Sequence, residues 1–534
     1  MRNSIKWINI GVVFIMCVVL VLAGCSSSQT SKTTEKSNIA GEKETNKGPK
    51  VLKVAVPGNA THLDPAFSSS GPDRTVNQPI YNGLVHFKPG TTDVNAIEGD
   101  LAEKWENNSD GTIWTFHLRK GVKWQFDYGE FTSADVKYTF DRLLDPKTGS
   151  AYTEDLKVIK EVQTPDKYTV VFQLNQPDPI FLQRLLVDDM GGAIVKKEAI
   201  EAAGKDSMVK PVGTGPFMLK EYKLNEKVVL EKNPNYFRGE PKLDEIEFVT
   251  MTDQNAVDIA MEKGEIQLAT GSGDKLWLEK MKTKKDLKID FPGAPINWLL
   301  HLNSSIKPLD DKRVREAIAH AIDMDKYVKQ VTDPGVAMLA SGPIASNLDG
   351  HTDLGVYKYD PELSKKLLKE AGYRNGLELP PNFVNTRPAY FKLMTYIQEQ
   401  LRQVGIKMEL KQADIPTYQA NIRKGLNNVV LKAGTFKSAS FAFSDFLSSS
   451  IGSTNYSHYN KSDDLIVQAT QEMDKNKAKE LYADIQKQIM ADYAVIPLIE
   501  TNNVLFRRTE VNLGYDIKGT LVYSYPIYET TDLQ

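Results

Sequence analysis

Residues 391–410, FKLMTYIQEQLRQVGIKMEL, contain a helix pattern, a stop and a strand pattern in direct succession. The segment from Phe391 to Val404 predicts a helix, and Gly405 is the residue type that most often follows a helix end. The next five residues, IKMEL, alternate apolar and polar side chains, which is typical of a half-buried strand. A helix and a strand joined by a single glycine indicate an α/β protein.

The same alternation of strands and helices is found along the rest of the chain. Val51–Val56 predicts a first strand, because it is apolar except for Lys53 and ends at a Pro-Gly turn. Thr132 and Asp135 form a capping-box-like start for a helix over SADVKYTFDRLL, residues 133–144. Another helix is expected between an N-cap at Asp360 and a stop at Gly372. The fold class is therefore predicted as α/β.

Length and composition exclude several classes of protein. The 534 residues predict three or four domains, at roughly 150 residues per domain. The hydrophobic share of 41% and the charged share of 25% are those of a folded soluble body. Lys and Arg total 66 against 69 Asp and Glu, so no global positive field favours nucleic acid as a partner.

The two cysteines, Cys17 and Cys25, both lie near the amino terminus, which excludes disulfides and cysteine chemistry from the rest of the chain. Arg2 and Lys6 precede the apolar run Trp7–Leu22, which is too short for a permanent membrane span and predicts a signal peptide over 1–24. The run ends in Leu-Ala-Gly-Cys, which resembles the bacterial lipobox. The resemblance implies that Cys25 carries a lipid anchor. Residues 25–50 are polar and predict a disordered tether.

Several stretches in order resemble the extracytoplasmic solute-binding proteins of family 5, the oligopeptide-, dipeptide- and nickel-binding lipoproteins of ABC transporters. These stretches are LAEKWENNSDGTIWTFHLRKGVKW (101–124), FTSADVKYTFDRLLDP (131–146), PVGTGPF (211–217), NPNYFRGEPKLDEIEF (233–248), PLDDKRVREAIAHAID (308–323) and AGY (371–373). Each stretch alone is a weak signal, but their order and spacing taken together are specific for this family. The resemblance covers the chain from about Val51 to its end.

The resemblance implies a two-lobed periplasmic-binding-protein-like fold, type II and cluster C, with an additional domain. The chain is expected to cross between the lobes near Pro295 and Thr501, and these crossings form the hinge on which the lobes close over a ligand. Residues 1–24 are the expected signal peptide and 25–50 the tether. Lobe I is expected from three segments, 51–84, 207–294 and 502–534, with the extra domain II over 85–206 and lobe II over 295–501.

Ligand-binding candidates follow from the family motifs. In such proteins an extended peptide is held through its main chain, which gives affinity with little sequence preference. The loop after Leu63-Asp64-Pro65 has small residues that allow close approach of the main chain. The alternative for this loop is a plain surface loop without contact to the ligand. The alternative for Trp298 is a position in the core of lobe II. The candidates are Ser68, Ser69, Ser70, Gly71, Tyr152, Trp298, Arg387, Tyr390, Lys432, Gly434, Phe436, Ser438 and Ala439.

The segment 429–447, VVLKAGTFKSASFAFSDFL, departs from the family pattern. Peptide-binding members have Gly-Trp here and, two or three residues later, an aspartate for the ligand's α-ammonium group. In this chain that aspartate is expected at Ser438 or Ala439, which carry no charge. Lys432 stands where the family has a basic residue for a carboxylate, and Asp445 is the nearest alternative acid. The sequence therefore predicts a site that holds mainly the anionic end of its ligand.

Catalytic and metal sites are weakly supported. Ser304-Ser305-Ile306-Lys307 and Lys147-Thr148-Gly149 match penicillin-binding elements in the wrong order, so a loop and a helix-end turn are expected instead. The pairs Asp188-Asp189, Asp310-Asp311 and Asp463-Asp464 are interpreted as caps or solvated surface. The seven histidines lack metal-ligand spacing, and only His458 is kept as a candidate for contact with a metal chelate.

The sequence thus predicts a non-enzymatic receptor without a cofactor. We expect a monomer, lipid-anchored on the outer face of the bacterial cell membrane, that captures oligopeptides between its lobes. It would deliver them to the permease and ATPase subunits of an ABC importer. A non-peptide ligand, such as a nickel-metallophore chelate or an oligosaccharide, is the alternative. A secreted hydrolase is a more distant alternative.

Overall fold

The computed structural model describes residues 48–534 except 294–295, 334, 452 and 522–523. These residues form one compact unit, Pro49–Gln534. The predicted signal peptide, Cys25, most of the tether and Pro295 lie outside the described residues. Among the helices that are described, none is both long enough and apolar enough to cross a membrane.

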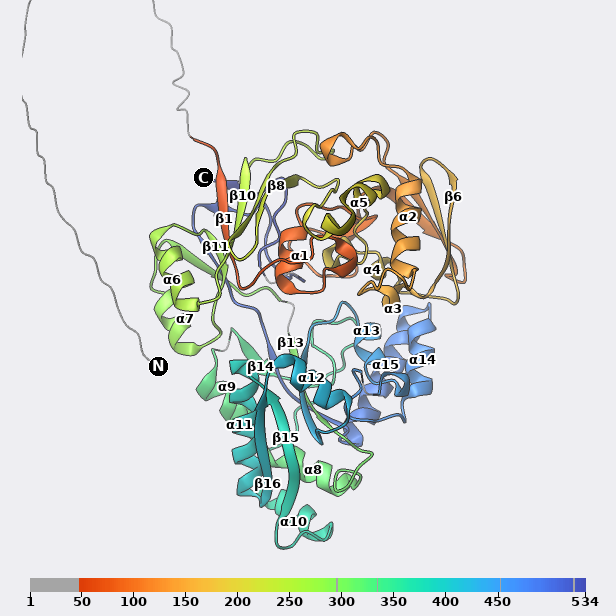
Figure 1. Cartoon of the computed structure of the whole chain (residues 1–534). Helices are drawn as coiled ribbons and strands as arrows, with labels where there is room; N and C mark the ends of the chain where they lie inside the picture. The colour runs from red at the N-terminus through yellow and green to blue at the C-terminus, as the bar shows by residue number, and fades with distance from the viewer. Residues whose placement is uncertain (1–47, 294–295, 334, 452, 522–523) are drawn as a thin grey trace, which may run out of the picture. The chain divides into compact units, whose positions relative to one another are not determined.

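A seven-stranded mixed sheet is built from segments that are far apart in the sequence. The central strand β1 (Val51–Val56) pairs in parallel with β10 (Glu245–Thr250) and β11 (Leu268–Thr270), as Figure 1 shows. The other strands of the order β12-β19-β11-β1-β10-β9-β8 are β12 (Leu287–Asp290), β19 (Leu505–Arg508), β9 (Lys227–Lys232) and β8 (Phe217–Lys223).

A four-stranded antiparallel sheet of order β4-β5-β7-β6 shares its hydrophobic core with the seven-stranded sheet. Phe116 and Phe172 from this sheet belong to the same buried cluster as Leu52 and Leu230, and we call this cluster the first core. Helix α2 (Ser133–Leu144) lies beside β6, as seen in Figure 1. The strands are β4 (Ala102–Asn107), β5 (Ile113–Leu118), β6 (Ile159–Asp166) and β7 (Thr169–Leu174).

The segment from 296 to 501 contains a second antiparallel sheet with cores on both faces. Because side chains alternate along a strand, Leu300 of β13 enters one cluster and Leu299 enters another. We call these clusters the second core and the third core. The sheet order is β14-β18-β13-β17, with β14 (Ala337–Leu339), β18 (Val495–Thr501), β13 (Ile296–Leu302) and β17 (Val429–Gly434).

The remaining elements surround these sheets. A parallel pair, β15 (Leu377–Asn385) and β16 (Ile406–Ala413), packs on α11 (Pro388–Gln403). Two short antiparallel pairs are β2 (Val85–Phe87) with β3 (Ile97–Gly99) and β20 (Val511–Asn512) with β21 (Asp532–Leu533). The other α-helices are α1 (Gly71–Asn77), α3 (Thr153–Leu156), α4 (Phe181–Arg184), α5 (Lys197–Ala203), α6 (Gln254–Lys263), α7 (Lys275–Met281), α8 (Lys312–Ala321), α9 (Met324–Val331), α10 (Pro361–Glu370), α12 (Ile415–Arg423), α13 (Ala439–Ser444), α14 (Asp463–Gln471) and α15 (Lys475–Ala491).

The strands that flank the two connections between the large sheets pair with each other. Strand β13 begins at Ile296, and Ile296 pairs with Thr501 at the end of β18. On the other side of this junction, β12 and β19 pair with each other in the seven-stranded sheet. The described ends of the two connections therefore lie next to each other in both sheets, which is the arrangement that a hinge requires.

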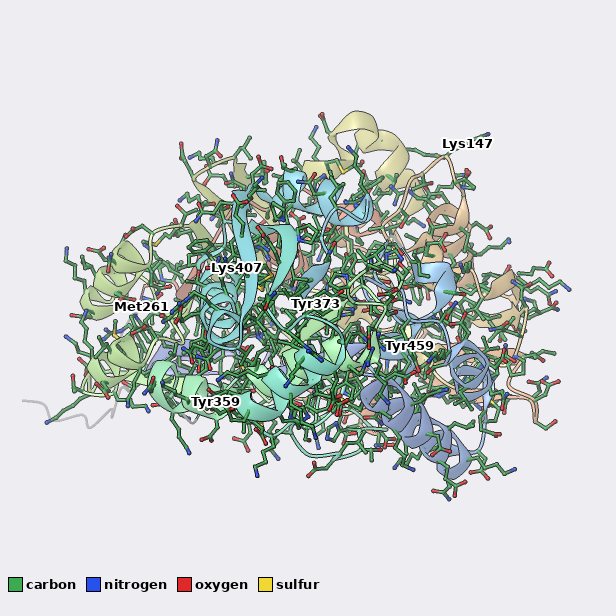
Figure 2. The ribbon with its side chains drawn as sticks, turned by 90° about the horizontal axis from the view of Figure 1, so that it is seen from below. Lys147, Met261, Tyr359, Tyr373, Lys407 and Tyr459 are labelled. Atoms are coloured by element: carbon green, nitrogen blue, oxygen red, sulfur yellow. The ribbon has the colours of Figure 1, made fainter. Side chains whose placement is uncertain are left out.

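Most predicted elements are confirmed. The first strand, the helix over 133–144 with its capping box, and the helix starting at Asp360-Pro361 have the expected starts. Lys147 is exposed in the turn after α2, where Figure 2 shows it at the edge of the molecule. One interpretation was wrong: Asp189 is not solvated surface but is 9% exposed and ion-paired.

Candidate functional site

A cavity of about 350 Å³ is lined by residues from two regions of the chain. One region contributes to the first core, and the other contributes to the second and third cores. We call it the charged cavity, because it contains Arg74, Lys437 and three aspartates. Its volume is at the lower end of the roughly 300–1,000 Å³ of small-molecule sites. The lining residues are Arg74, Asp155, Asp189, Ile296, Thr435, Phe436, Lys437, Phe441, Ser444, Asp445, Asn503, Thr520 and Leu521.

Asp189 bridges two cations at this cavity. Its Oδ1 lies 2.8 Å from Nη1 of Arg74, and its Oδ2 lies 2.6 Å from Nζ of Lys437. Burial opposes the charged form of Asp189, but the charges of Lys437 and Arg74 outweigh burial and lower the pKa of the carboxyl group. Asp189 is therefore ionised, and the three residues together carry one net positive charge.

Asp155 is the carboxylate of the cavity that has no ion-pair partner in the described part of the chain. Helix α3 carries it, and the main-chain oxygen of Asp155 accepts a hydrogen bond of 2.8 Å from Nη1 of Arg184. Arg184 directs its Nε to Asp178 at 2.6 Å. Among the described residues, no group donates a hydrogen bond to the Asp155 carboxylate or forms an ion pair with it. Burial, partly offset by Lys437 and reinforced by Asp189, raises its pKa.

Asp445, which lines the cavity, and Lys432, which lies behind it and does not, neutralise each other. Nζ of Lys432 donates a hydrogen bond to Oδ2 of Asp445 and another, of 3.3 Å, to the main-chain oxygen of Thr454. The same ammonium group lies over the rings of Phe436 and Tyr456, at 5.8 and 5.7 Å from their centroids. The expectation of an uncompensated Lys432 is therefore corrected, because Asp445 already holds its charge.

The loop candidates support two helices that reach the cavity. The hydroxyl group of Tyr152 donates a hydrogen bond of 2.5 Å to the main-chain oxygen of Ser68, which is fully buried. Ser70 caps α1, since its Oγ accepts a hydrogen bond of 3.2 Å from the main-chain nitrogen of Asp73. Ser69 is exposed, and Gly71 is the first residue of α1. Helix α1 carries Arg74, and Tyr152 directly precedes α3, which carries Asp155.

Two of the predicted residues, Trp298 and Tyr390, lie in or on the second core instead, and a third, Arg387, lies on the surface. Trp298 is 8% exposed, its ring centroid lies 4.9 Å from that of Tyr390, and its Nε1 donates a hydrogen bond of 2.8 Å to Oγ1 of Thr501. Arg387 is exposed and directly precedes α11. None of these residues is among those that line the charged cavity.

The segment after β17 divides between two cavities. Gly434 ends β17, where an added Cβ would lie 2.9 Å from the ring of Phe436. Phe436 lines the charged cavity, whereas Ser438 and Ala439 line a second cavity of about 270 Å³. Ser438 accepts a hydrogen bond from the main-chain nitrogen of Phe441 as the N-cap of α13. The positions at which the family aspartate was expected are therefore not on the wall of the charged cavity.

The sequence reasoning missed Arg74, Asp155, Asp189 and Lys437, which meet only in the folded chain. Within the stretch of chain that is described, no group of His, Cys, Asp and Glu is arranged to hold a metal ion. His458 is half-buried beside Ser305, with 3.4 Å between Nδ1 and the Ser305 Oγ, and it does not line the charged cavity.

Comparison with known proteins places this architecture in a family. Residues 96–483 match the model of bacterial extracellular solute-binding proteins, family 5 Middle. The chain is 31% identical to the dipeptide-binding protein of Escherichia coli K12, over 85% of this chain and 90% of that protein. It is 29% identical to heme-binding protein A of Haemophilus influenzae, over 88% of this chain and 89% of that protein.

Solved structures agree with these matches. MoaA of A. tumefaciens R10 in complex with mannopinic acid has a TM-score of 0.81 and 35% identity, covering 91% of this chain and all of that one. DppA of Helicobacter pylori in complex with the peptide STSA has a TM-score of 0.77 and 27% identity, covering 90% and 98%. The fold is thus that of the two-lobed periplasmic binding proteins. The chain belongs to the bacterial extracellular solute-binding proteins of family 5, which bind solutes for ABC importers and are not enzymes.

Proposed function

We propose that this protein is a lipid-anchored receptor that captures short peptides in the charged cavity and delivers them to an ABC permease. The observation that carries the proposal is the combination of charges in one cavity of about 350 Å³. The lining includes both the net positive group of Arg74, Asp189 and Lys437 and the Asp155 carboxylate, which has no partner among the described residues.

A short peptide has the complementary charges, with an ammonium group at one end and a carboxylate at the other. In a partly desolvated cavity each of these charges needs a counter-charge, because an uncompensated buried ion costs several kcal/mol. The cavity offers one net charge of each sign. Phe436 and Phe441 add apolar surface to the same lining.

The relatives support the class of ligand. One relative bears the name dipeptide-binding protein, and one structural neighbour holds the peptide STSA. A second candidate ligand is an amino-acid derivative, because the neighbour at 35% identity holds mannopinic acid. Both classes carry ionised groups of both signs and fit the same charge pattern.

The anchor and the closing motion belong to the proposal. Leu22-Ala23-Gly24-Cys25 supplies the lipidation motif and the polar segment after it supplies the tether. We keep the division into lobe I (51–84, 207–294, 502–534), extra domain (85–206) and lobe II (295–501). The adjacent connections at Ile296 and Thr501 then serve as the hinge.

Mass spectrometry of released ligands tests the proposal. The body, residues 49–534, is purified without added ligand and denatured, and the small molecules released are identified. Short peptides of mixed sequence are the expected result. A single chelate, sugar or opine would overturn the peptide proposal and leave the receptor role in place. Calorimetry with trialanine then measures peptide binding directly.

A further inference from the structure

Asp155 differs from the other aspartates of the charged cavity in its surroundings. Asp189 is held by two cations, and Asp445 is held by Lys432. The Asp155 carboxylate has no such partner among the described residues, although it lines the same cavity. A partly buried carboxylate without a partner is costly, and such groups are commonly retained for binding or catalysis.

The charges around Asp155 leave this carboxylate available to a ligand. Arg184, the cation of α4, directs its Nε to Asp178, and its Nη1 to the main chain of Asp155 rather than to the carboxylate. Lys437 directs its Nζ to Asp189. Arg184 and Lys437 are thus each paired with another carboxylate, so neither occupies the Asp155 carboxylate as an ion-pair partner.

We propose that the Asp155 carboxylate binds the ammonium group of the ligand, so that α3 supplies the anionic anchor that Ser438 and Ala439 lack. The ligand class is a small molecule with both an ammonium and a carboxylate group. This inference rests on the proposed function of the charged cavity. It also gives the ligand one orientation, with its ammonium group at Asp155 and its carboxylate toward Arg74 and Lys437.

Two isosteric variants separate this role from a general effect of charge. Asp155→Asn removes the charge and keeps the shape, and the absence of a partner for the carboxylate implies that folding is unaffected. Glu154→Gln is the matched control, since Glu154 is the neighbour in α3 and forms an exposed ion pair with Lys157. Circular dichroism melts verify that both variants fold, and Asp155→Ser is the second variant if Asp155→Asn melts early.

Calorimetry uses trialanine, N-acetyl-trialanine and mannopinic acid as ligands. Acetylation is expected to weaken binding to the wild type by about ten- to a hundredfold, the usual value of a charge-assisted contact. In Asp155→Asn the free and acetylated peptides should bind equally, and in Glu154→Gln the wild-type difference should remain. Those three results together support the inference.

The other outcomes separate the inference from the proposed function. If acetylation weakens binding equally in the wild type and in Asp155→Asn, peptide binding stands and the role of Asp155 is overturned. If only mannopinic acid binds and Asp155→Asn weakens it at least tenfold, the peptide proposal fails and the Asp155 inference holds. If neither trialanine nor mannopinic acid binds, both the peptide proposal and the Asp155 inference are overturned. Both are also overturned if only mannopinic acid binds and Asp155→Asn leaves its affinity unchanged.

Discussion

Nζ of Lys437 lies 2.6 Å from Oδ2 of Asp189, and this ion pair joins two regions of the chain with separate hydrophobic cores. Val187 and Met190, on either side of Asp189, belong to the first core. Phe436 and Ala439, on either side of Lys437, pack in or on the third core. Both charged side chains are little exposed, at 11% and 12%. The pair is therefore in a position to hold the two regions together across the charged cavity.

Replacing Lys437 should weaken this connection without unfolding either region. In Lys437→Met, Asp189 keeps its ion pair with Arg74, so no buried charge is left alone. We expect a larger radius of gyration in solution scattering without ligand. We also expect trialanine to bind about tenfold more weakly, or about 1.4 kcal/mol.

Lys461→Met is the matched control for this experiment. Lys461 pairs with Asp492 at 2.7 Å on an exposed surface, away from the cavity. Its loss should change neither the radius nor the affinity. An unchanged radius and affinity in Lys437→Met would show that the pair with Asp189 does not stabilise the closed arrangement.

The helices were predictable because their signals are local. Asp360, Pro361 and Gly372 act within one helix and its ends, and Thr132 with Asp135 closes a capping box over three residues. The charged cavity was not predictable in the same way. Arg74, Asp155 and Lys437 look like ordinary surface residues until the fold brings them together.

Family motifs identified only one wall of the cavity. They led to Phe436, which lines the cavity, and to Lys432, which pairs with the lining residue Asp445, because the segment 429–447 has a recognisable counterpart in relatives. They could not show that Asp445 neutralises Lys432, since that depends on the path of the chain after α13. Two adjacent aspartates, Asp188 and Asp189, also give no indication in the sequence that one of them is buried. In the structure Asp189 is buried and pairs with two cations.

Cys25→Ser should release the protein from the membrane and leave its ligand binding unchanged. The thiol of Cys25 is the proposed site of lipid attachment, and stable anchoring requires the acyl chains attached there. Membrane fractionation by centrifugation, with mass spectrometry of the amino terminus, measures the effect. A variant that stays in the membrane fraction with an uncleaved terminus would show that the run Trp7–Leu22 is itself the anchor.

His301 should make the protein less stable in mild acid. The ring is fully buried between Phe446 and Tyr456, and both ring nitrogens lack a hydrogen-bond partner among the described residues. Burial, with the nearby charge of Lys432, lowers its pKa well below the usual value. The folded state therefore holds neutral His301, while the unfolded chain takes up a proton below about pH 6.5.

The free energy of unfolding should then decrease as the pH falls below about 6.5, by up to about 1.4 kcal/mol per pH unit from this group. His301→Phe should remove that slope and keep or raise the stability at pH 7.5, since it removes two unsatisfied polar atoms. Urea titrations between pH 5 and 7.5 measure both effects. His117→Gln, at a side chain that is 34% exposed, is the control and should keep the wild-type slope. An equal slope in His301→Phe would assign the acid sensitivity to other groups.

Removing one member of the Lys432–Asp445 pair should change which ligand charge the cavity prefers, because the remaining member is then no longer neutralised. Lys432→Met frees the Asp445 carboxylate, so trialanine amide, a cation, should bind more tightly and N-acetyl-trialanine, an anion, about tenfold more weakly. Asp445→Asn frees Lys432 and should reverse both changes.

Because the double variant removes both charges, its affinities should return to within about threefold of the wild type, which a double-mutant cycle by calorimetry measures. Lys365→Met, at an exposed pair with Glu362, is the control for overall charge. If both single variants weaken both ligands, the pair serves only to hold the cavity wall, and its charge does not reach the ligand.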